Sequence, residues 1–324
     1  MKAALVKAYG APDSIVIEDI ASPTPKEGEV KVRLRACGVN FPDVLMVAGK
    51  YQFKPEMPFS PGAEMAGEVI ELGPNTEGAR IGDRVLCFLG HGGMAEEIVV
   101  PVKALVPMPP GMDFNMAAAV TLTYGTSYHA LKQRAALRAG EKLLVLGAAG
   151  GVGLAAVELG KQMGAEVYAA ASTADKLALA QSRGADHLIN YTEVDLKAQI
   201  KEMTNGQGVD VIYDPVGGEL FDACLRSLAW NGRLLVIGFA SGEIPKAPAN
   251  LPLLKGSSIV GVFWGAFTQR EPQAHQENMQ ELAQWFATGA LKPHIGHEFP
   301  LDQAGAAMNV LANRQAMGKV VITI

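Results

Sequence analysis

A glycine-rich turn that follows a short apolar run is the feature of this sequence that most clearly predicts chemistry. Leu143–Leu146 is continuously apolar, and Gly147–Gly153 follows as Gly-Ala-Ala-Gly-Gly-Val-Gly. Gly150 lets the backbone approach a pyrophosphate, and Gly153 lets the following helix pack closely on the strand. The N-terminus of that helix offers N–H donors to the pyrophosphate. The alternative is a turn that only joins two elements. The pattern favours a dinucleotide site, formed by Ala148, Gly150, Gly151, Val152 and Gly153.

The end of the next strand decides between NAD and NADP. An acidic residue at that position accepts a hydrogen bond from a ribose 2′-hydroxyl and indicates NAD. Here the strand ends as Ala169–Thr173 with no acid at its tip, and Lys176 follows. A hydroxyl and a cation suit a 2′-phosphate, so NADPH is the expected cofactor. Asp175 leaves an alternative, because it is either a displaced acid or an exposed residue favoured by the helix dipole.

Zinc ligands are missing where many two-domain oxidoreductases carry them. Such ligands are Cys, His or carboxylate side chains at fixed positions. The expected Gly-His-Glu is Gly62-Ala63-Glu64 here, the expected Cys is Asn40, and no four-cysteine cluster exists. Cys37 has no partner and is expected to be a small buried hydrophobe. The sequence predicts a protein without a metal.

Composition and charge exclude several classes of protein. The chain has 324 residues, which suits two domains of roughly 100–200 residues. Apolar residues make up 49% and charged ones 19%, too apolar for intrinsic disorder. The net charge is −5 with no basic run, so neither nucleic acid nor a membrane surface is an expected partner. Three scattered cysteines argue against a disulfide framework.

The chain carries no evident export or membrane signal. Its first residues lack an apolar signal-peptide core and are expected to form a strand. The longest apolar run, Leu143–Val157, contains four glycines and is too short to span the roughly 30 Å hydrocarbon core. We therefore expect a cytoplasmic protein.

The spacing of apolar residues changes along the chain. Near the N-terminus short alternating runs predict strands, whereas from Ala119 to Val262 apolar runs alternate with helical stretches, as in a parallel sheet with crossover helices. The tail predicts two helices and a closing strand, with Asp302 as a helix N-cap. The expected elements are strands Lys2–Lys7, Glu29–Ala36, Ile98–Val100, Leu143–Leu146, Val167–Ala171, Leu188–Asn190, Val209–Tyr213, Leu234–Ile237, Ile259–Val262 and Lys319–Ile324, and helices Gln273–Thr288 and Asp302–Asn313.

The whole chain resembles the zinc-free branch of the medium-chain dehydrogenase/reductase superfamily, specifically the NADPH:quinone oxidoreductases related to zeta-crystallin. The resemblance rests on Arg35–Asp43, Pro61–Gly67, Gly82–Val85, Tyr124–Thr126, Ala148–Gly153, Asp214–Gly218 and Gly261–Gly265. It implies an α/β fold in which a Rossmann doubly wound parallel sheet, residues 121–264, is inserted in a mainly β, GroES-like catalytic domain, residues 1–120 plus 265–324.

The resemblance also implies further cofactor-binding residues. The side chains expected around the adenosine 2′-phosphate are Ser172, Lys176, Tyr191 and Arg314. On the nicotinamide side the expected residues are Thr126, Gly238, Phe239 and Phe263. Lys176 is alternatively an exposed helix residue, and Arg314 alternatively caps the last helix.

The reaction expected without a metal is hydride transfer to an electron-poor acceptor, such as a quinone or an alkene conjugated to a carbonyl. The family's substrate-side polar groups correspond to Asn40, Asp43 and Tyr51. Tyr51 is either a proton donor or an amphipathic pocket wall, Asn40 either orients an acceptor carbonyl or holds a loop, and Asp43 either acts in the reaction or binds backbone N–H groups. Leu45 replaces a tyrosine of some quinone reductases, which makes the acceptor site more apolar.

Other functions remain open from the sequence. One is an enoyl-thioester reductase, which needs basic residues at the mouth of a long cleft. Another, from a different class, is a non-catalytic NADPH-binding protein with a structural or RNA-interacting role, as among zeta-crystallin relatives. The negative charge and the lack of a basic aromatic face argue against RNA.

Ser257–Trp264 predicts the mode of assembly. This apolar, β-branched run closes the βαβ series, so it is expected to be an edge strand. An uncovered apolar edge is an aggregation hazard, and pairing with the same strand of a second subunit covers it. We expect a homodimer; the alternative is that the helix Gln273–Thr288 shields the edge.

Overall fold

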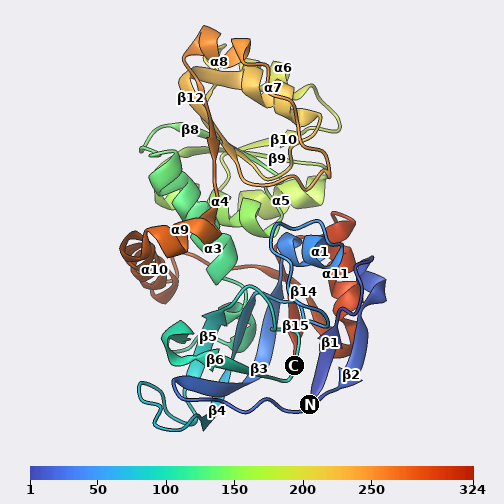
Figure 1. Cartoon of the computed structure of the whole chain (residues 1–324). Helices are drawn as coiled ribbons and strands as arrows, with labels where there is room; N and C mark the ends of the chain where they lie inside the picture. Colours follow the sequence, from blue (N-terminus) through green and yellow to red (C-terminus); the bar gives the residue numbers. More distant parts are fainter. The chain divides into compact units, whose positions relative to one another are not determined.

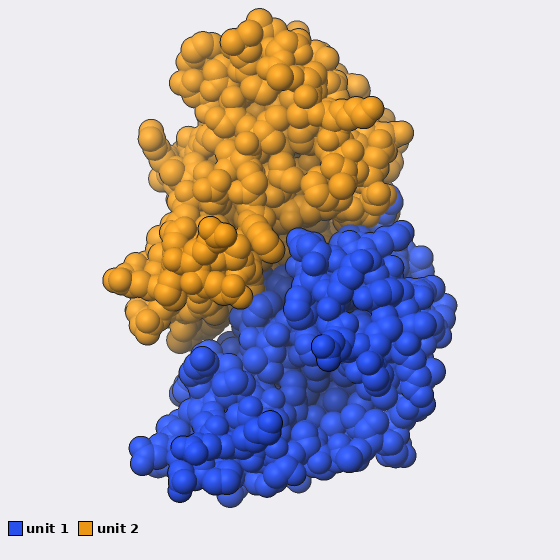
Figure 2. Space-filling view, viewed as in Figure 1, with its two compact units in different colours: residues 1–122, 293–324 blue, residues 123–292 orange.

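The computed structural model describes all 324 residues and divides them into two compact units (Figure 2). Unit 1 consists of Met1–Leu122 and Pro293–Ile324, and unit 2 of Thr123–Lys292. One unit is therefore made from both ends of the chain and the other from its middle, as the sequence predicts. None of the helices is both long and apolar enough to cross a membrane.

Unit 2 is built on a six-stranded parallel sheet in the order β10-β9-β8-β11-β12-β13. Figure 1 labels β8, β9, β10 and β12 of this sheet. The order reverses between β8 and β11, which confirms the predicted doubly wound fold. Its strands are β8 (Lys142–Leu146), β9 (Glu166–Ala171), β10 (His187–Asn190), β11 (Val209–Asp214), β12 (Leu228–Val236) and β13 (Ser258–Gly261). Its helices are α4 (Gly151–Gln162), α5 (Ala174–Ser182), α6 (Leu196–Met203), α7 (Leu220–Ser227), α8 (Asn250–Lys255), α9 (Trp264–Arg270) and α10 (Pro272–Ala287).

The central strands of unit 2 are buried, which explains their continuous apolar runs. Leu144 and Leu146 on β8, Ile212 on β11 and Leu234 on β12 are all fully buried in one core cluster. Helices cover parallel sheets, so both sides of such strands must be apolar. The core places the carboxyl ends of the strands in fixed register.

Unit 1 contains a mainly antiparallel sheet, in which β14-β15-β3-β4-β5-β7 are neighbours in that order and β6 also pairs with β3. Its strands are β1 (Lys2–Leu5), β2 (Val16–Asp19), β3 (Glu29–Val39), β4 (Glu64–Leu72), β5 (Arg84–Phe88), β6 (Glu97–Pro101), β7 (Leu105–Pro107), β14 (Ile295–Pro300) and β15 (Lys319–Thr323). Its helices are α1 (Phe41–Val47), α2 (Phe114–Ala117) and α11 (Ala304–Ala312), with 3-10 turns at Pro12–Ser14, Val102–Ala104 and Leu301–Gln303.

Helix α3 (Thr121–His129) starts at the boundary between the units and continues into a π-helical turn, Ala130–Arg134. The compact units differ from the predicted domains in two segments: residues 121–122 belong to unit 1, and residues 265–292 belong to unit 2. The second difference is the larger one. The reason is side-chain packing of α10 against α3 and the π-helical turn. Lys132 donates to Glu281 at 2.6 Å, and the Gln133 and Asn278 amides exchange hydrogen bonds of 2.8 and 3.0 Å.

The prediction that Asp302 caps the last helix is wrong. Asp302 lies inside a 3-10 turn, Leu301–Gln303, and α11 begins only at Ala304 with Gln303 in the N-cap position. Short 3-10 turns are common at helix N-termini. The tighter turn moves the helix start two residues downstream of the one that the sequence predicts.

Two histidines make the packing of α9 and α10 sensitive to acid. The His129 ring stacks on Phe267 with centroids 3.9 Å apart, and His275 packs edge-on to the same ring at 6.2 Å. Burial lowers the pKa of both imidazoles below their usual 6.5. The unfolded chain therefore binds protons at a higher pH than the native state does, and stability falls as the pH drops below about 6.5.

We expect the thermal unfolding temperature of the wild type to fall more between pH 7 and pH 5 than that of the double variant His129→Gln, His275→Gln. Glutamine keeps a polar side chain of similar length but does not titrate. The measurement is thermal unfolding followed by circular dichroism at each pH. Parallel pH profiles of the two proteins would contradict the prediction.

Candidate functional site

The glycine turn after β8 has the geometry of a dinucleotide-binding loop. Helix α4 starts at Gly151, directly after the extended Gly150, and Gly147 has a left-handed backbone with φ of 55°. A Cβ added to Gly153 would lie 2.2 Å from the Gly147 carbonyl oxygen, so this position excludes any side chain. A Cβ on Gly150 would meet only that oxygen, at 3.4 Å. Gly150 thus borders open space beside the helix N-terminus, where an anion is favoured.

The loops that follow four other strands lie at the same edge of the parallel sheet. Ser172 follows β9, and Asp214 ends β11. The loop after β12 bonds to the loop after β11: the Gly238 N–H donates to the Asp214 carbonyl at 3.4 Å. Phe239 packs beside Gly217, and Phe263, after β13, is 56% exposed. The strand topology therefore places Ser172, Gly238, Phe239 and Phe263 at the edge of the sheet where the glycine turn lies.

Ser172 and Lys176 lie together where a 2′-phosphate is expected. The Lys176 ammonium donates to Ser172 Oγ at 3.4 Å, and burial lowers the pKa of this lysine. The Tyr191 N–H donates to the Ala171 carbonyl at 3.3 Å, so this tyrosine follows the adjacent strand next to Ser172. Asp175 is exposed in the first turn of α5. The Ser172 and Lys176 side chains offer a hydroxyl and a cation to one phosphate.

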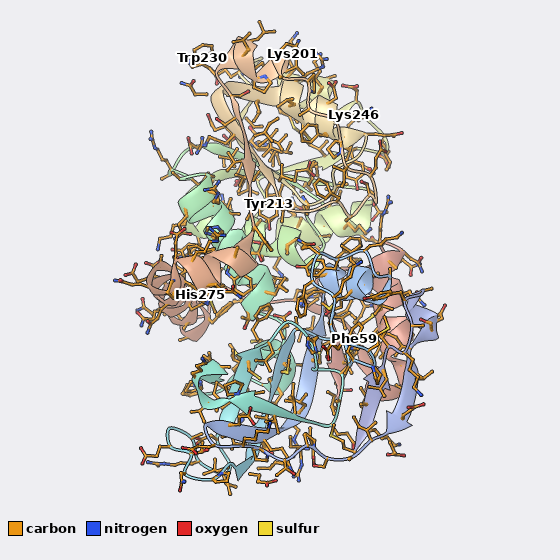
Figure 3. All side chains as sticks on the ribbon, viewed as in Figure 1. Phe59, Lys201, Tyr213, Trp230, Lys246 and His275 are labelled. Carbon is orange, nitrogen blue, oxygen red and sulfur yellow. The ribbon has the colours of Figure 1, made fainter.

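Thr126 is positioned by a neighbour that the sequence analysis did not single out. Ser127, adjacent to it on α3, is fully buried and donates to the Val152 carbonyl at 2.9 Å. Because that bond uses the serine proton, the Tyr213 hydroxyl 2.8 Å away must donate to Ser127 Oγ. Tyr213 lies in the interior of unit 2 (Figure 3). These bonds hold α3 to the glycine turn.

Arg314 belongs to unit 1, where it follows α11. Its backbone is left-handed, with φ of 57°, and its N–H donates to the Leu311 carbonyl at 3.0 Å. That conformation costs a residue other than glycine roughly 1–2 kcal/mol. Backbone strain of this kind is concentrated at functional sites. Its grouping with Ser172, Lys176 and Tyr191 stays a prediction.

Asp43, on α1, is fully buried and bound to the backbone. Its two carboxyl oxygens accept hydrogen bonds from the Asn40 N–H at 2.8 Å and the Gly62 N–H at 3.2 Å. Burial raises the pKa of this carboxyl to about 7, against the lowering effect of those bonds and of the Lys319 charge. The carboxyl joins the start of α1 to the loop before β4.

The Asn40 side chain is fully engaged within unit 1. Its amide nitrogen donates to Glu64 Oε1 at 2.9 Å and to the Gly38 carbonyl at 3.4 Å. Its Oδ1 accepts from the Lys319 ammonium at 2.7 Å. Both amide protons therefore have partners, which supports the loop-holding role over the orientation of an acceptor carbonyl.

Tyr51 differs from Asn40 and Asp43 because its hydroxyl makes no hydrogen bond in the structure, while its ring packs against the apolar core of unit 1. Burial and, to a smaller extent, the Asp43 charge raise the pKa of the phenol, so it keeps its proton at neutral pH. An uncommitted phenol is able to donate a proton or a hydrogen bond. Of the three predicted substrate-side residues, Tyr51 is the one with unused capacity.

The residues around Asn40 do not fit zinc. No group of three or more His, Cys, Asp and Glu side chains is arranged to hold a metal ion. The Glu64 carboxylate is paired with Lys319 and accepts the Leu122 N–H at 2.8 Å. Cys37 is fully buried, and a Cβ on Gly62 would lie 2.4 Å from its sulfur. Even an open catalytic zinc site takes three such protein ligands, and the residues around Asn40 do not supply them.

Glu64 and Lys319 are thus site residues that sequence reasoning missed. In the sequence, Glu64 stands out only as part of Gly62-Ala63-Glu64, which lacks the histidine of a zinc motif. Lys319 opens the apolar strand β15, whose first four residues are all buried. A lysine at the start of such a run is unusual, because buried lysines need a charged partner. A lysine at the start of an apolar strand is therefore the sequence signal that could have indicated a buried ion pair.

Elemental analysis should find far less than one zinc per chain, and chelators should leave activity unchanged. The expectation follows from Ala63 and Asn40 at the ligand positions and from the committed Glu64 carboxylate. Inductively coupled plasma mass spectrometry on protein purified without added metal gives the count. Activity that EDTA abolishes and zinc restores would contradict the prediction.

Comparisons with known protein families match most of the chain. The family described as "Alcohol dehydrogenase GroES-like domain" matches residues 26–110, and the one described as "Zinc-binding dehydrogenase" matches residues 151–287. The first match lies within unit 1 and the second within unit 2. The zinc in the second description is at odds with the residues around Asn40.

Individual relatives match the chain from end to end. A quinone oxidoreductase-like protein 2 homolog of Nematostella vectensis is 42% identical, covering 99% of this chain and 88% of the relative. The quinone oxidoreductase of Homo sapiens is 33% identical, covering 100% of this chain and 98% of the relative. Two solved structures complexed with NADPH each cover 100% of both chains at a TM-score of 0.92: a mycobacterial protein, 30% identical, and the Escherichia coli quinone oxidoreductase, 27% identical.

Proposed function

The chain belongs to the quinone oxidoreductase-like family of the medium-chain dehydrogenase/reductase superfamily, and on that premise we propose that it transfers hydride from NADPH to a quinone or an electron-poor α,β-unsaturated carbonyl without zinc. The observation that carries the cofactor assignment is the Lys176–Ser172 pair beyond the glycine turn. A cation and a hydroxyl at that strand end suit a 2′-phosphate, whereas NAD calls for an acid.

The residues of unit 2 fit a dinucleotide. The N–H groups at the start of α4 would hold the pyrophosphate beside Gly150, and Ser172, Lys176 and Tyr191 would hold the 2′-phosphate. Thr126, Gly238, Phe239 and Phe263 would flank the nicotinamide, as the family resemblance implies. NADPH supplies the hydride when it is bound. The protein binds and aligns it, and alignment alone contributes much of the rate in such reactions.

The proposed acceptor is electron-poor, because such a molecule accepts hydride from NADPH without needing a metal to polarise it. Tyr51 is the residue that we assign to the acceptor side, as its neutral phenol has no partner in the structure. For an enone, hydride adds to the β-carbon and a proton to the α-carbon, so a phenol is a suitable source of the proton. Asp43 and Asn40 then fix the backbone around α1 rather than touch the acceptor.

Two other functions stay open alternatives, an enoyl-thioester reductase and a non-catalytic NADPH-binding protein. They separate in one experiment that follows NADPH oxidation with 1,2-naphthoquinone, 9,10-phenanthrenequinone and crotonyl-CoA side by side. We expect turnover with the quinones to exceed turnover with the thioester. Preference for crotonyl-CoA would indicate the thioester reductase, and binding of NADPH without turnover of any acceptor would indicate the non-catalytic role.

We also propose that the protein is a homodimer joined through β13. This strand is an edge of the unit 2 sheet, and Ile259 on it is 37% exposed. It covers only Ser258–Gly261 and is shorter than the predicted Ser257–Trp264, because Trp264 begins α9. Neighbouring surface is apolar as well: Trp230 on β12 and Leu253 and Leu254 on α8 are 70–79% exposed, and Trp230 projects from the outer part of unit 2 (Figure 3). An uncovered edge beside exposed apolar side chains favours association.

Light scattering at micromolar concentration should give a mass near 68 kDa, twice the chain mass of 34.2 kDa. Val260→Lys, in the middle of β13, should shift the mass towards the monomer and lower solubility, because it places a charge on the paired edge. The exposed Lys201→Glu variant on α6 is the control for a change of surface charge alone. A wild-type particle of 34 kDa that persists on concentration would contradict the proposal.

A further inference from the structure

Unit 1 contains a lysine ammonium enclosed by oxygen atoms. Lys319, at the start of β15, is only 4% exposed. Its ammonium contacts Glu64 Oε1, Asn40 Oδ1 at 2.7 Å and the Val39 carbonyl at 3.4 Å. An ammonium has three protons to donate, and these three oxygens are the matching number of acceptors. A buried charge persists only with such complete pairing.

The side chains that carry two of these oxygen atoms also have partners other than the ammonium. Glu64 is 1% exposed, and its second oxygen accepts the Leu122 N–H at 2.8 Å. The Asn40 amide donates to Glu64 Oε1 at 2.9 Å, which turns its Oδ1 towards the lysine. The acceptors would therefore keep their places if the ammonium were removed. They come from the end of β3, the start of β4 and the loop before α1.

We propose that Glu64, Asn40 and the Val39 carbonyl form a cation site selective for a primary ammonium, filled in this protein by its own Lys319. The site includes Asn40 and Glu64, two of the positions at which the sequence analysis looks for zinc ligands. One carboxylate balances one ammonium charge, whereas zinc would bring a second charge and demand nitrogen or sulfur ligands that are absent. The proposal is independent of the acceptor that the protein reduces.

Removing the lysine tests the site by chemical rescue. Lys319→Ala leaves Glu64 buried without its partner and opens a cavity the size of the lost side chain. We expect its unfolding temperature to fall by about 10 °C, since an uncompensated buried charge is strongly destabilising in a protein of this size. Millimolar n-propylammonium should restore most of that loss, because it supplies both the ammonium and the missing methylenes.

Two further additives test whether the rescue depends on charge or only on filling the cavity, and whether it is specific for an ammonium over a metal ion. n-Propanol fills the same cavity without a charge, and zinc chloride supplies a charge without the shape; both should restore much less. Lys319→Met fills the cavity permanently, so it should not respond to n-propylammonium. Lys31→Ala is the matched control, because Lys31 pairs with the half-exposed Glu71 elsewhere in unit 1 and should show no rescue.

Equal restoration by n-propanol would show that only volume matters, and stronger restoration by zinc would show a metal site; either result overturns the proposal. If Lys319→Ala does not fold unaided, refolding it in n-propylammonium or n-propanol gives the same comparison through soluble yield. The double variant Glu64→Gln, Lys319→Met should then be more stable than Lys319→Met, because it removes the unpaired Glu64 carboxylate. A double variant that is no better contradicts the charge pairing on which the site depends.

Discussion

Gly150→Ala should weaken NADPH binding by about tenfold to a hundredfold and leave the unfolding temperature of the cofactor-free protein unchanged. A methyl group at this position meets only the Gly147 carbonyl oxygen, at 3.4 Å, which is an ordinary contact. It would project instead into the open space beside the first turn of α4, where a pyrophosphate is expected. The loss corresponds to about one hydrogen bond to a charged group. Fluorescence titration with NADPH and thermal unfolding provide the two readouts.

Gly153→Ala is the matched control with the opposite outcome. Its methyl would lie 2.2 Å from the Gly147 carbonyl oxygen, so the helix or the turn has to move. We expect a loss of about 1–3 kcal/mol of stability without any cofactor, as for overpacking in a tight core. If Gly150→Ala binds NADPH as tightly as the wild type, the glycine turn is not the pyrophosphate site.

Lys176→Ala should raise the dissociation constant for NADPH by about 10-fold to 150-fold and leave that for NADH almost unchanged. A hydrogen bond to a charged group contributes about 1.5–3 kcal/mol, and only NADPH carries the 2′-phosphate that makes it. The wild type should bind NADPH much more tightly than NADH. Titration of both cofactors on both proteins measures the effect.

The control for this variant is Lys201→Ala, which removes an exposed lysine from α6 in the outer part of unit 2 (Figure 3). It should not change the preference for NADPH. Wild-type protein that binds NADPH and NADH within a factor of two would show that the 2′-phosphate site is assigned wrongly, whatever the variant does.

The architecture was predictable because its signals are local. The buried strands β8, β9 and β11 are short apolar runs, and the glycine turn after β8 combines a fixed spacing with a strand before it and a helix after it. Ser172 and Lys176 were predictable for the same reason, since Lys176 is four positions after Ser172 and both follow one strand. Family resemblance supplied the residues from distant parts of the chain, such as Arg314.

The buried polar contacts were not predictable, because they join segments that are far apart in the sequence. Lys319 and Glu64 are separated by 255 positions, and Ser127 and Tyr213 by 86. No spacing rule connects such pairs. The boundary at Lys292 was missed similarly, since only the packing of α10 on α3 shows that residues 265–292 belong to unit 2. The helix cap at Asp302 was predicted wrongly because aspartate is a common N-cap residue. The 3-10 turn at Leu301–Gln303 instead moves the start of the helix to Ala304.

The rate of NADPH oxidation by metal-free protein, with and without 9,10-phenanthrenequinone, tests the central claim most directly. The protein is first treated with a chelator, and NADPH absorbance is followed with enough protein to detect slow turnover. We expect rapid oxidation that requires both the quinone and the protein, and much slower oxidation with NADH. Tight NADPH binding with no acceleration by the quinone, or activity that returns only when zinc is added, would contradict it.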